Sequence, residues 1–166
     1  MDRISGIANQ GMLNKTPEER LKTLAGNLDR AYDHDYLNCF PNNIGKLEKV
    51  SCDEIRSKLA QNYDDCLFQP GDSFQTISEG KQAVKDFSKT VRQLPVNLIK
   101  ADNDYSPDLE QVVKGAKNIE QFFNNGNFSA ISYIRAENAD APYCHDILMG
   151  ALPSGQTLGV IVACRS

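Results

Sequence analysis

Several signatures of cofactor and metal chemistry are missing from this sequence. It contains no Walker loop, no GxGxxG stretch, no HExxH motif and no cysteine or histidine set with zinc spacing. We therefore expect no nucleotide, no metal ion and no other cofactor. A basic stripe is also missing and the net charge is −4, which argues against nucleic acid as a partner.

Long apolar runs and paired cysteines are missing as well. No run approaches the length of a membrane span, so we expect no membrane insertion. The first residues do not place a continuous apolar segment behind a positive charge, so we expect no secretory signal peptide. The five cysteines are an odd number without paired spacing, which favours reduced thiols. This pattern predicts a cytoplasmic, reducing compartment, or delivery to a host cytosol without a classical signal peptide.

What remains is the composition of a globular domain. Of the 166 residues, 40% are hydrophobic and 24% are charged, which is enough for one domain with its own core. Residues 1–15 show no hydrophobic period, and we interpret them as a flexible N-terminal arm. Residues 16–166 are expected to form a single α+β domain.

Capping residues and apolar periodicity predict the helices. Thr16 is a capping residue, Pro17 suits the first helical position and Glu19 completes a capping box. Comparable signals predict helices at about 17–33, behind Ser51, at about 79–93 behind Ser78, and from Ser106 to about 125. We expect Pro95 to end the third helix, Val96–Lys100 to form a short strand, and Tyr36–Gly45 to be irregular.

The C-terminal stretch has the pattern of a sheet. Strand signals cover Phe128–Ile134, His145–Leu152 and Thr157–Cys164. The last two runs flank Pro153-Ser154-Gly155-Gln156, which suits a turn between hairpin strands. Val160–Ala163 has no polar break, so this strand should be covered on both faces. We predict about four helices packed on a mainly antiparallel sheet, with a C-terminal three-strand meander.

The residues that would carry catalysis are cysteines and a histidine. Cys52 follows a Ser cap at a helix start, where the helix dipole lowers a thiol pKa, and Cys39 lies in an expected loop. His145 begins a strand and would pair with one of these thiols as a base. Gln156 is the candidate that would orient the imidazole. The alternative is that all five cysteines are small buried hydrophobes and that His145 is structural.

This order of Cys39 or Cys52, His145 and Gln156 resembles papain-like thiol hydrolases and the small bacterial effector and amidase enzymes of that plan. In those enzymes an N-terminal helix carries Cys, and C-terminal strands carry His and then Asp, Asn or Gln. The resemblance implies a protease, amidase or deamidase. The last predicted strand, Val160–Cys164, has no acid or amide where the third residue usually lies.

Tyrosines and acidic residues gather in two segments, 29–36 and 102–108. Tyr32, Tyr36 and Tyr105 are the tyrosines of these segments. Tyrosine gives a large amphipathic contact area at low entropy cost, so such segments often enter interfaces. The alternative is an ordinary polar surface.

These patterns leave two hypotheses, and they leave open whether the chain is an enzyme. The first is a small soluble protein that acts by binding another protein, as an adaptor, chaperone-like partner, inhibitor or effector. The second is a cysteine-dependent hydrolase that uses a Cys–His pair. We place the binding protein first because the catalytic set is incomplete.

Overall fold

The computed structural model of the chain describes residues 15–48, 50–62, 68, 72–138 and 143–165. Their helices are α2 (Pro17–Tyr32), α3 (Cys52–Asn62), α4 (Gly80–Ala101) and α5 (Leu109–Asn125). Their strands are β1 (Leu37–Lys46), β2 (Ser73–Glu79), β3 (Ser129–Glu137), β4 (Tyr143–Ala151) and β5 (Gln156–Arg165). The predicted N-terminal arm falls almost entirely on residues 1–14, which lie outside the described residues.

The strands form one antiparallel sheet in the order β1-β5-β4-β3-β2. This arrangement confirms the predicted α+β class, with helices against an antiparallel sheet that contains a C-terminal meander of β3, β4 and β5. Every sequence neighbour from β2 to β5 is also a neighbour in the sheet. β1 is the exception, because it pairs with β5.

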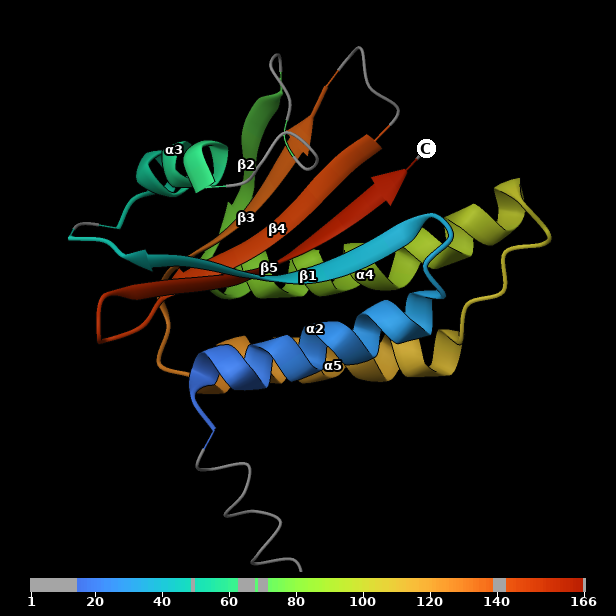
Figure 1. Ribbon diagram of the computed structural model, residues 1–166, viewed down its shortest axis with the longest axis horizontal. Helices are drawn as coiled ribbons and strands as arrows, with labels where there is room; N and C mark the ends of the chain where they lie inside the picture. Colours follow the sequence, from blue (N-terminus) through green and yellow to red (C-terminus); the bar gives the residue numbers. More distant parts are fainter. Residues whose placement is uncertain (1–14, 49, 63–67, 69–71, 139–142, 166) are drawn as a thin grey trace, which may run out of the picture.

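Helices cover the two faces of the sheet unequally (Figure 1). α2, α4 and α5 lie together against one face, which we call the three-helix face, and α3 lies on the other, which we call the α3 face. The larger core lies on the three-helix face, where Phe87 of α4 and Val160 of β5 are buried. The smaller core lies on the α3 face, where Ile55 of α3 meets Ile147 of β4 and Ile161 of β5.

β5 is buried on both of its faces, as its unbroken apolar run predicts. Val160 and Val162 point into the larger core and Ile161 into the smaller one, and all three are 0% exposed. Successive strand residues alternate between faces, so a strand covered on both sides has no position that needs a polar side chain. β5 therefore lies inside the sheet, between β1 and β4.

The predicted cap of the first helix is also confirmed. The Thr16 hydroxyl accepts a hydrogen bond from the Glu19 backbone N–H at 3.1 Å, and Pro17 is the first residue of α2. In α5 the cap is Asp108, whose carboxylate accepts from the Gln111 N–H at 3.2 Å.

The prediction that Pro95 ends a helix is wrong. Pro95 lies inside α4, which continues to Ala101, so Val96–Lys100 is helical and not a strand. A proline inside a helix costs about 3 kcal/mol. Leu94 and Leu98 pack against the larger core on either side of Pro95. Pro95 is itself buried, and this packing stabilises the helix against the local cost of proline.

Two strands were not expected from the sequence. Most of the segment Tyr36–Gly45, predicted to be irregular, is β1, and pairing with β5 from Leu37 to Lys46 stabilises it. The residues just before α4 form β2, so Ser78 is a strand residue and not the helix cap. Both segments are polar, and their strand conformation comes from pairing with a neighbour.

Candidate functional site

The cysteines predicted to be nucleophiles lie in different layers. Cys39 is in β1 on the three-helix face, is 4% exposed, and its pKa is raised by burial. Cys52 is the first residue of α3, and its thiol donates to the Glu79 carboxylate. Its sulfur also lies 3.0 Å from the Ser132 hydroxyl oxygen. Burial, and then the hydrogen bond to Glu79, raise the pKa of Cys52 above the usual range of a thiol.

His145 is in β4 on the α3 face. It is 3% exposed, its ring centroid lies 4.9 Å from that of Phe68, and burial lowers its pKa. Cys39 therefore lies on the opposite face of the sheet. Cys52 contacts Ser132, whose partner in β4 is Met149, four residues from His145. At about 3.3 Å per residue, that offset separates Cys52 from His145 by roughly 13 Å.

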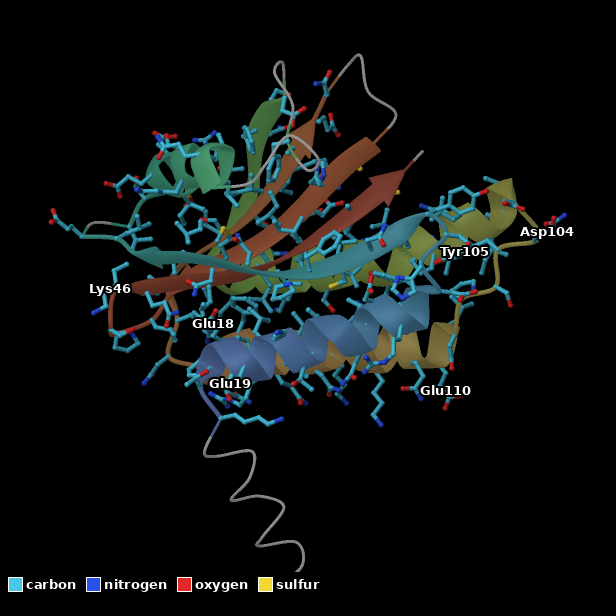
Figure 2. All side chains as sticks on the ribbon, in the orientation of Figure 1. Glu18, Glu19, Lys46, Asp104, Tyr105 and Glu110 are labelled. Carbon is cyan, nitrogen blue, oxygen red and sulfur yellow. The ribbon has the colours of Figure 1, made fainter. Side chains whose placement is uncertain are left out.

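Gln156 lies at the other end of the sheet from His145. It pairs with Lys46, and its side-chain amide donates to the Glu18 carboxylate at 3.3 Å. Figure 2 shows Glu18 and Lys46 at the same end of the molecule. His145 pairs with Ala163, seven residues further along β5, which is roughly 23 Å away. The structure does not bring Cys39, Cys52, His145 and Gln156 together, and the hydrolase hypothesis stays a prediction.

The three predicted binding tyrosines do meet, mostly in the interior. The Tyr105 hydroxyl donates to the Tyr32 carbonyl, and the Tyr32 hydroxyl donates to the Val91 carbonyl. The Tyr36 ring packs edge-on against Tyr105 with centroids 5.7 Å apart. Tyr32 is 0% and Tyr105 is 3% exposed. These contacts hold the segment after α4, where Figure 2 labels Tyr105, against the end of α2. Tyr36, which is partly exposed, is the one that reaches the surface.

The sequence analysis did not predict that backbone groups of β2 would face away from β3, on the outer side of the strand. β2 pairs with β3, and among the described residues no strand pairs with its other side. Arg56 of α3 donates from Nη1 to the Phe74 carbonyl at 3.2 Å, so the backbone of Phe74 faces away from β3. Backbone direction alternates along an antiparallel strand, so Thr76 faces outward too. We call this outer side of β2, from Phe74 to Ile77, the open edge.

A pocket of about 430 Å³ adjoins the open edge, between α4 and the strands β2 and β3. Its walls combine apolar, hydrogen-bonding and charged side chains: Ile77, Asp86, Lys89, Thr90, Gln93, Leu94, Asn97, Tyr133 and Arg135. Ile77 lies at the point where the register between β2 and β3 shifts, and its side chain is 39% exposed. We call this cavity the edge pocket.

A buried polar network forms the floor of the edge pocket. The Asp146 carboxylate, 1% exposed, receives hydrogen bonds from the Tyr133 hydroxyl and from Arg135 Nε at 3.1 Å. Arg135 Nη2 also donates to the Tyr133 oxygen at 3.0 Å. The single Tyr133 proton goes to the carboxylate, which can only accept, so Thr90, 3.1 Å away, donates to Tyr133.

This network places charged and hydrogen-bonding groups where a ligand in the edge pocket can reach them. Burial, and then the negative charge of Asp146, raise the pKa of Tyr133 above the usual range of a phenol, so the hydroxyl stays protonated. The Arg135 guanidinium is held charged by Asp146. The pocket therefore presents the remaining N–H groups of Arg135 beside Ile77 and Leu94, a combination that suits a bound side chain.

The signal for this site in the sequence is weak. Tyr133, Arg135 and Asp146 are scattered along two strands, and only the register between β3 and β4, in which Arg135 faces Asp146, brings them together. An Asp within the otherwise apolar run His145–Leu152 is the one feature that could have pointed to a buried polar contact.

Comparisons with known proteins give no family and no relative: no protein family matches the chain, and no curated protein matches it either. Among the described residues, no helix has both the length and the apolar character that crossing a membrane requires. In the same part of the chain, no three His, Cys, Asp or Glu side chains are grouped so that they could hold a metal ion.

Proposed function

We propose that this chain is a binding protein that takes up an extended peptide segment of a partner protein along the open edge of β2. The observation that carries the proposal is the outward-facing backbone at Thr76, next to the exposed Ile77 and the edge pocket. An extended peptide adds a strand to such an edge through main-chain hydrogen bonds, and a pocket for its side chains gives specificity. This is a concrete form of the protein-binding hypothesis.

The composition of β2 supports this use. Natural proteins protect sheet edges with proline, inward-pointing charges or very short strands. β2 spans Ser73–Glu79 without a proline, and its exposed positions include Gln75 and Ile77. A strand with an exposed aliphatic residue in the middle is one that a partner can extend.

The edge pocket supports an aliphatic side chain on the partner peptide. Ile77 and Leu94 provide apolar contact, and Gln93 and Thr90 provide amide and hydroxyl groups for the peptide backbone next to that side chain. Burying one aliphatic side chain contributes about 1.5–3 kcal/mol. Together with a few main-chain hydrogen bonds, this contribution is typical of reversible peptide recognition.

A partner peptide fits the open edge better than a second copy of the chain does. Arg56 already occupies the Phe74 carbonyl, and the register shift at Ile77 interrupts the straight part of the strand. A stable dimer needs an interface of about 1,600 Å². Only a short stretch around Thr76 is available, which is enough for a peptide anchored by one side chain.

The test uses phage-displayed random peptides selected on the full chain, followed by affinity measurements on three proteins: the wild type, Thr76→Pro and Thr76→Val. Proline removes the outward N–H at position 76 and leaves the groups that pair with β3 in place. Valine keeps the N–H and the branched shape, so it is the matched control. We expect peptides with an aliphatic residue that bind wild type and Thr76→Val alike and bind Thr76→Pro at least about tenfold more weakly.

Two results would overturn the proposal. One is a set of selected peptides whose affinity is the same for Thr76→Pro and Thr76→Val. The other is a concentration-dependent dimer in light scattering that Thr76→Pro abolishes, because the open edge would then belong to a second copy. Circular dichroism of both variants establishes that they are folded before affinities are compared.

A further inference from the structure

Cys144 and Cys164 face each other on neighbouring strands. β4 and β5 are antiparallel, and Cys144 is the residue directly opposite Cys164 in their register. Directly opposite residues have Cα atoms about 4.5–5.5 Å apart, within the range that a disulfide spans. Their side chains share the three-helix face, because both cysteines pack with the larger core. The two sulfur atoms are therefore held side by side by the sheet itself.

The two thiols already interact. The Cys144 thiol donates a hydrogen bond to Cys164, and both are free cysteines in the structure. This hydrogen bond lowers the pKa of Cys164, whose thiolate accepts it, and raises the pKa of Cys144. One thiolate of the pair is thus easier to form than an isolated buried thiolate, although the Asp146 carboxylate opposes it.

Access to the pair comes through Cys144. Cys164 is 8% exposed, whereas Cys144 is partly exposed near the start of β4. Cys39, by contrast, is 4% exposed with no cysteine opposite it in β5, where its partner is Val162. Cys52 is partly exposed, and its sulfur contacts Glu79 and Ser132. Among the described cysteines, Cys144 and Cys164 are the pair whose register allows a bond.

We propose that Cys144 and Cys164 are a dithiol modification site that forms a reversible disulfide across β4 and β5. The oxidant is a low-molecular-weight disulfide such as oxidised glutathione. This inference is independent of the peptide-binding proposal, because neither cysteine lines the edge pocket.

The reaction is thiol–disulfide exchange in two steps. One thiolate of the pair attacks a sulfur of oxidised glutathione, forms a mixed disulfide and releases one glutathione thiolate. The second thiolate attacks the protein sulfur of that mixed disulfide and releases the second glutathione. The two protons of the cysteines end on the two glutathione molecules, so two protein thiols are oxidised and one glutathione disulfide is reduced.

The test exposes the reduced full chain to oxidised glutathione, blocks remaining thiols with N-ethylmaleimide and maps tryptic peptides without reduction. No Lys or Arg lies between Arg135 and Arg165, so trypsin releases both cysteines in one peptide. In the bonded form this peptide loses the mass of two hydrogen atoms and takes up no N-ethylmaleimide. Cleavage by chymotrypsin then gives two fragments joined by the disulfide.

We expect the bonded peptide to form at least about tenfold faster in the native chain than in urea, because the sheet holds the thiols in position. Cys39→Ala and Cys52→Ser should leave this rate unchanged, and Cys144→Ser should leave Cys164 carrying N-ethylmaleimide or glutathione. A native peptide that carries two N-ethylmaleimide groups after the wild type has been exposed would overturn the proposal. Equal rates of bonding in the native and unfolded chains would do the same.

Discussion

The two outer strands of this sheet deal differently with their unpaired backbone. In β1 the Cys39 N–H, which faces away from β5, donates to the Asp29 carboxylate of α2 at 2.8 Å. Pro41, two residues further on, faces the same way and has no N–H to donate. In β2 the carbonyl of Phe74 is taken by Arg56, and Thr76 is left facing outward. We call the outer side of β1 the closed edge.

The difference shows that an edge can be closed without a further strand. One carboxylate and one proline are sufficient at β1, and both come from residue types that rank poorly as strand formers. β2 has one arginine contact but no proline, and it borders a pocket. The strand that keeps its edge open is the one beside a pocket, and this pairing of features underlies the proposed function.

The difference between the two edges is tested most directly by placing proline at adjacent positions of β2. Gln75 faces β3, where it pairs with Arg135, so Gln75→Pro removes a hydrogen bond inside the sheet. We expect it to lower the free energy of unfolding by about 2–3 kcal/mol, because a backbone acceptor also loses its partner. Thr76→Pro should lower it by less than about 1 kcal/mol. Urea unfolding followed by circular dichroism gives both values, and equal losses would mean that Thr76 does not face outward.

The contribution of the Asp29 carboxylate to the closed edge can be measured by removing it. Asp29→Ala leaves the N–H of buried Cys39 without its acceptor, and we expect a loss of about 1–3 kcal/mol in the free energy of unfolding. Asp29→Asn is the matched variant, because its amide oxygen can still accept. His34→Ala controls for the contact of His34 with Asp29, in which the His34 side chain is 59% exposed. His34→Ala should lower the free energy of unfolding, measured with urea, by at most about 1 kcal/mol. Equal losses for Asp29→Asn and Asp29→Ala would contradict the role of Asp29 as the acceptor for the Cys39 N–H.

Acid gives a further test, because His34 contacts Asp29, whose carboxylate closes the outer side of β1, and His145 is buried on the α3 face. Burial lowers the pKa of His145 below its ordinary value of 6.5. The unfolded chain therefore takes up the proton first as the pH falls, and stability present above about pH 6.5 is lost toward the lower folded pKa. We expect the melting temperature to fall as the pH is lowered below about 6.5.

His145→Asn should flatten that fall, although it lowers the melting temperature at every pH. If the melting temperature of His145→Asn depends on pH as steeply as that of the wild type, the loss comes from other groups.

The smallest expected effect concerns the end of β2, where the Cys52 thiol of α3 donates to Glu79. Because burial and the Glu79 carboxylate raise the pKa of Cys52, its alkylation by iodoacetamide at pH 7 should be slower than that of a free thiol. Glu79→Gln should make it faster. Peptide mapping after limiting iodoacetamide measures both. Fast labelling of wild-type Cys52 that His145→Ala removes would instead favour the thiol hydrolase.

The parts of the fold that the sequence predicts are those that depend on local chemistry. The cap at Thr16 and the apolar run Val160–Ala163 each specify an element without help from distant residues. β1 and β2 do not, because Asn42, Pro41 and their neighbours are poor strand formers that become strands by pairing. Pro95 misleads for the same reason, since packing of Leu98 against the core outweighs its local cost.

The candidate site was harder to predict than the fold. Thr76 and Ile77 carry no motif, and the outward direction of Thr76 depends on how β2 is paired with β3. Arg135 and Asp146 form an ion pair across strands, at 3.1 Å, that no spacing in the sequence reveals. The sequence drew attention to Cys39, Cys52 and His145 through their residue types, and the layers of the fold separate them.

The position of β5 between β1 and β4 has a consequence for the synthesis of this chain on the ribosome. Leu37 pairs with Cys164, so β1 leaves the exit tunnel long before its partner has been translated. Translation proceeds at about 5–20 residues per second, so β1 is without its partner strand for on the order of ten seconds. Asp29 belongs to α2, which precedes β1, so the carboxylate that caps the Cys39 N–H is present throughout that wait. The same contact that closes the finished edge is thus available to shield the nascent strand.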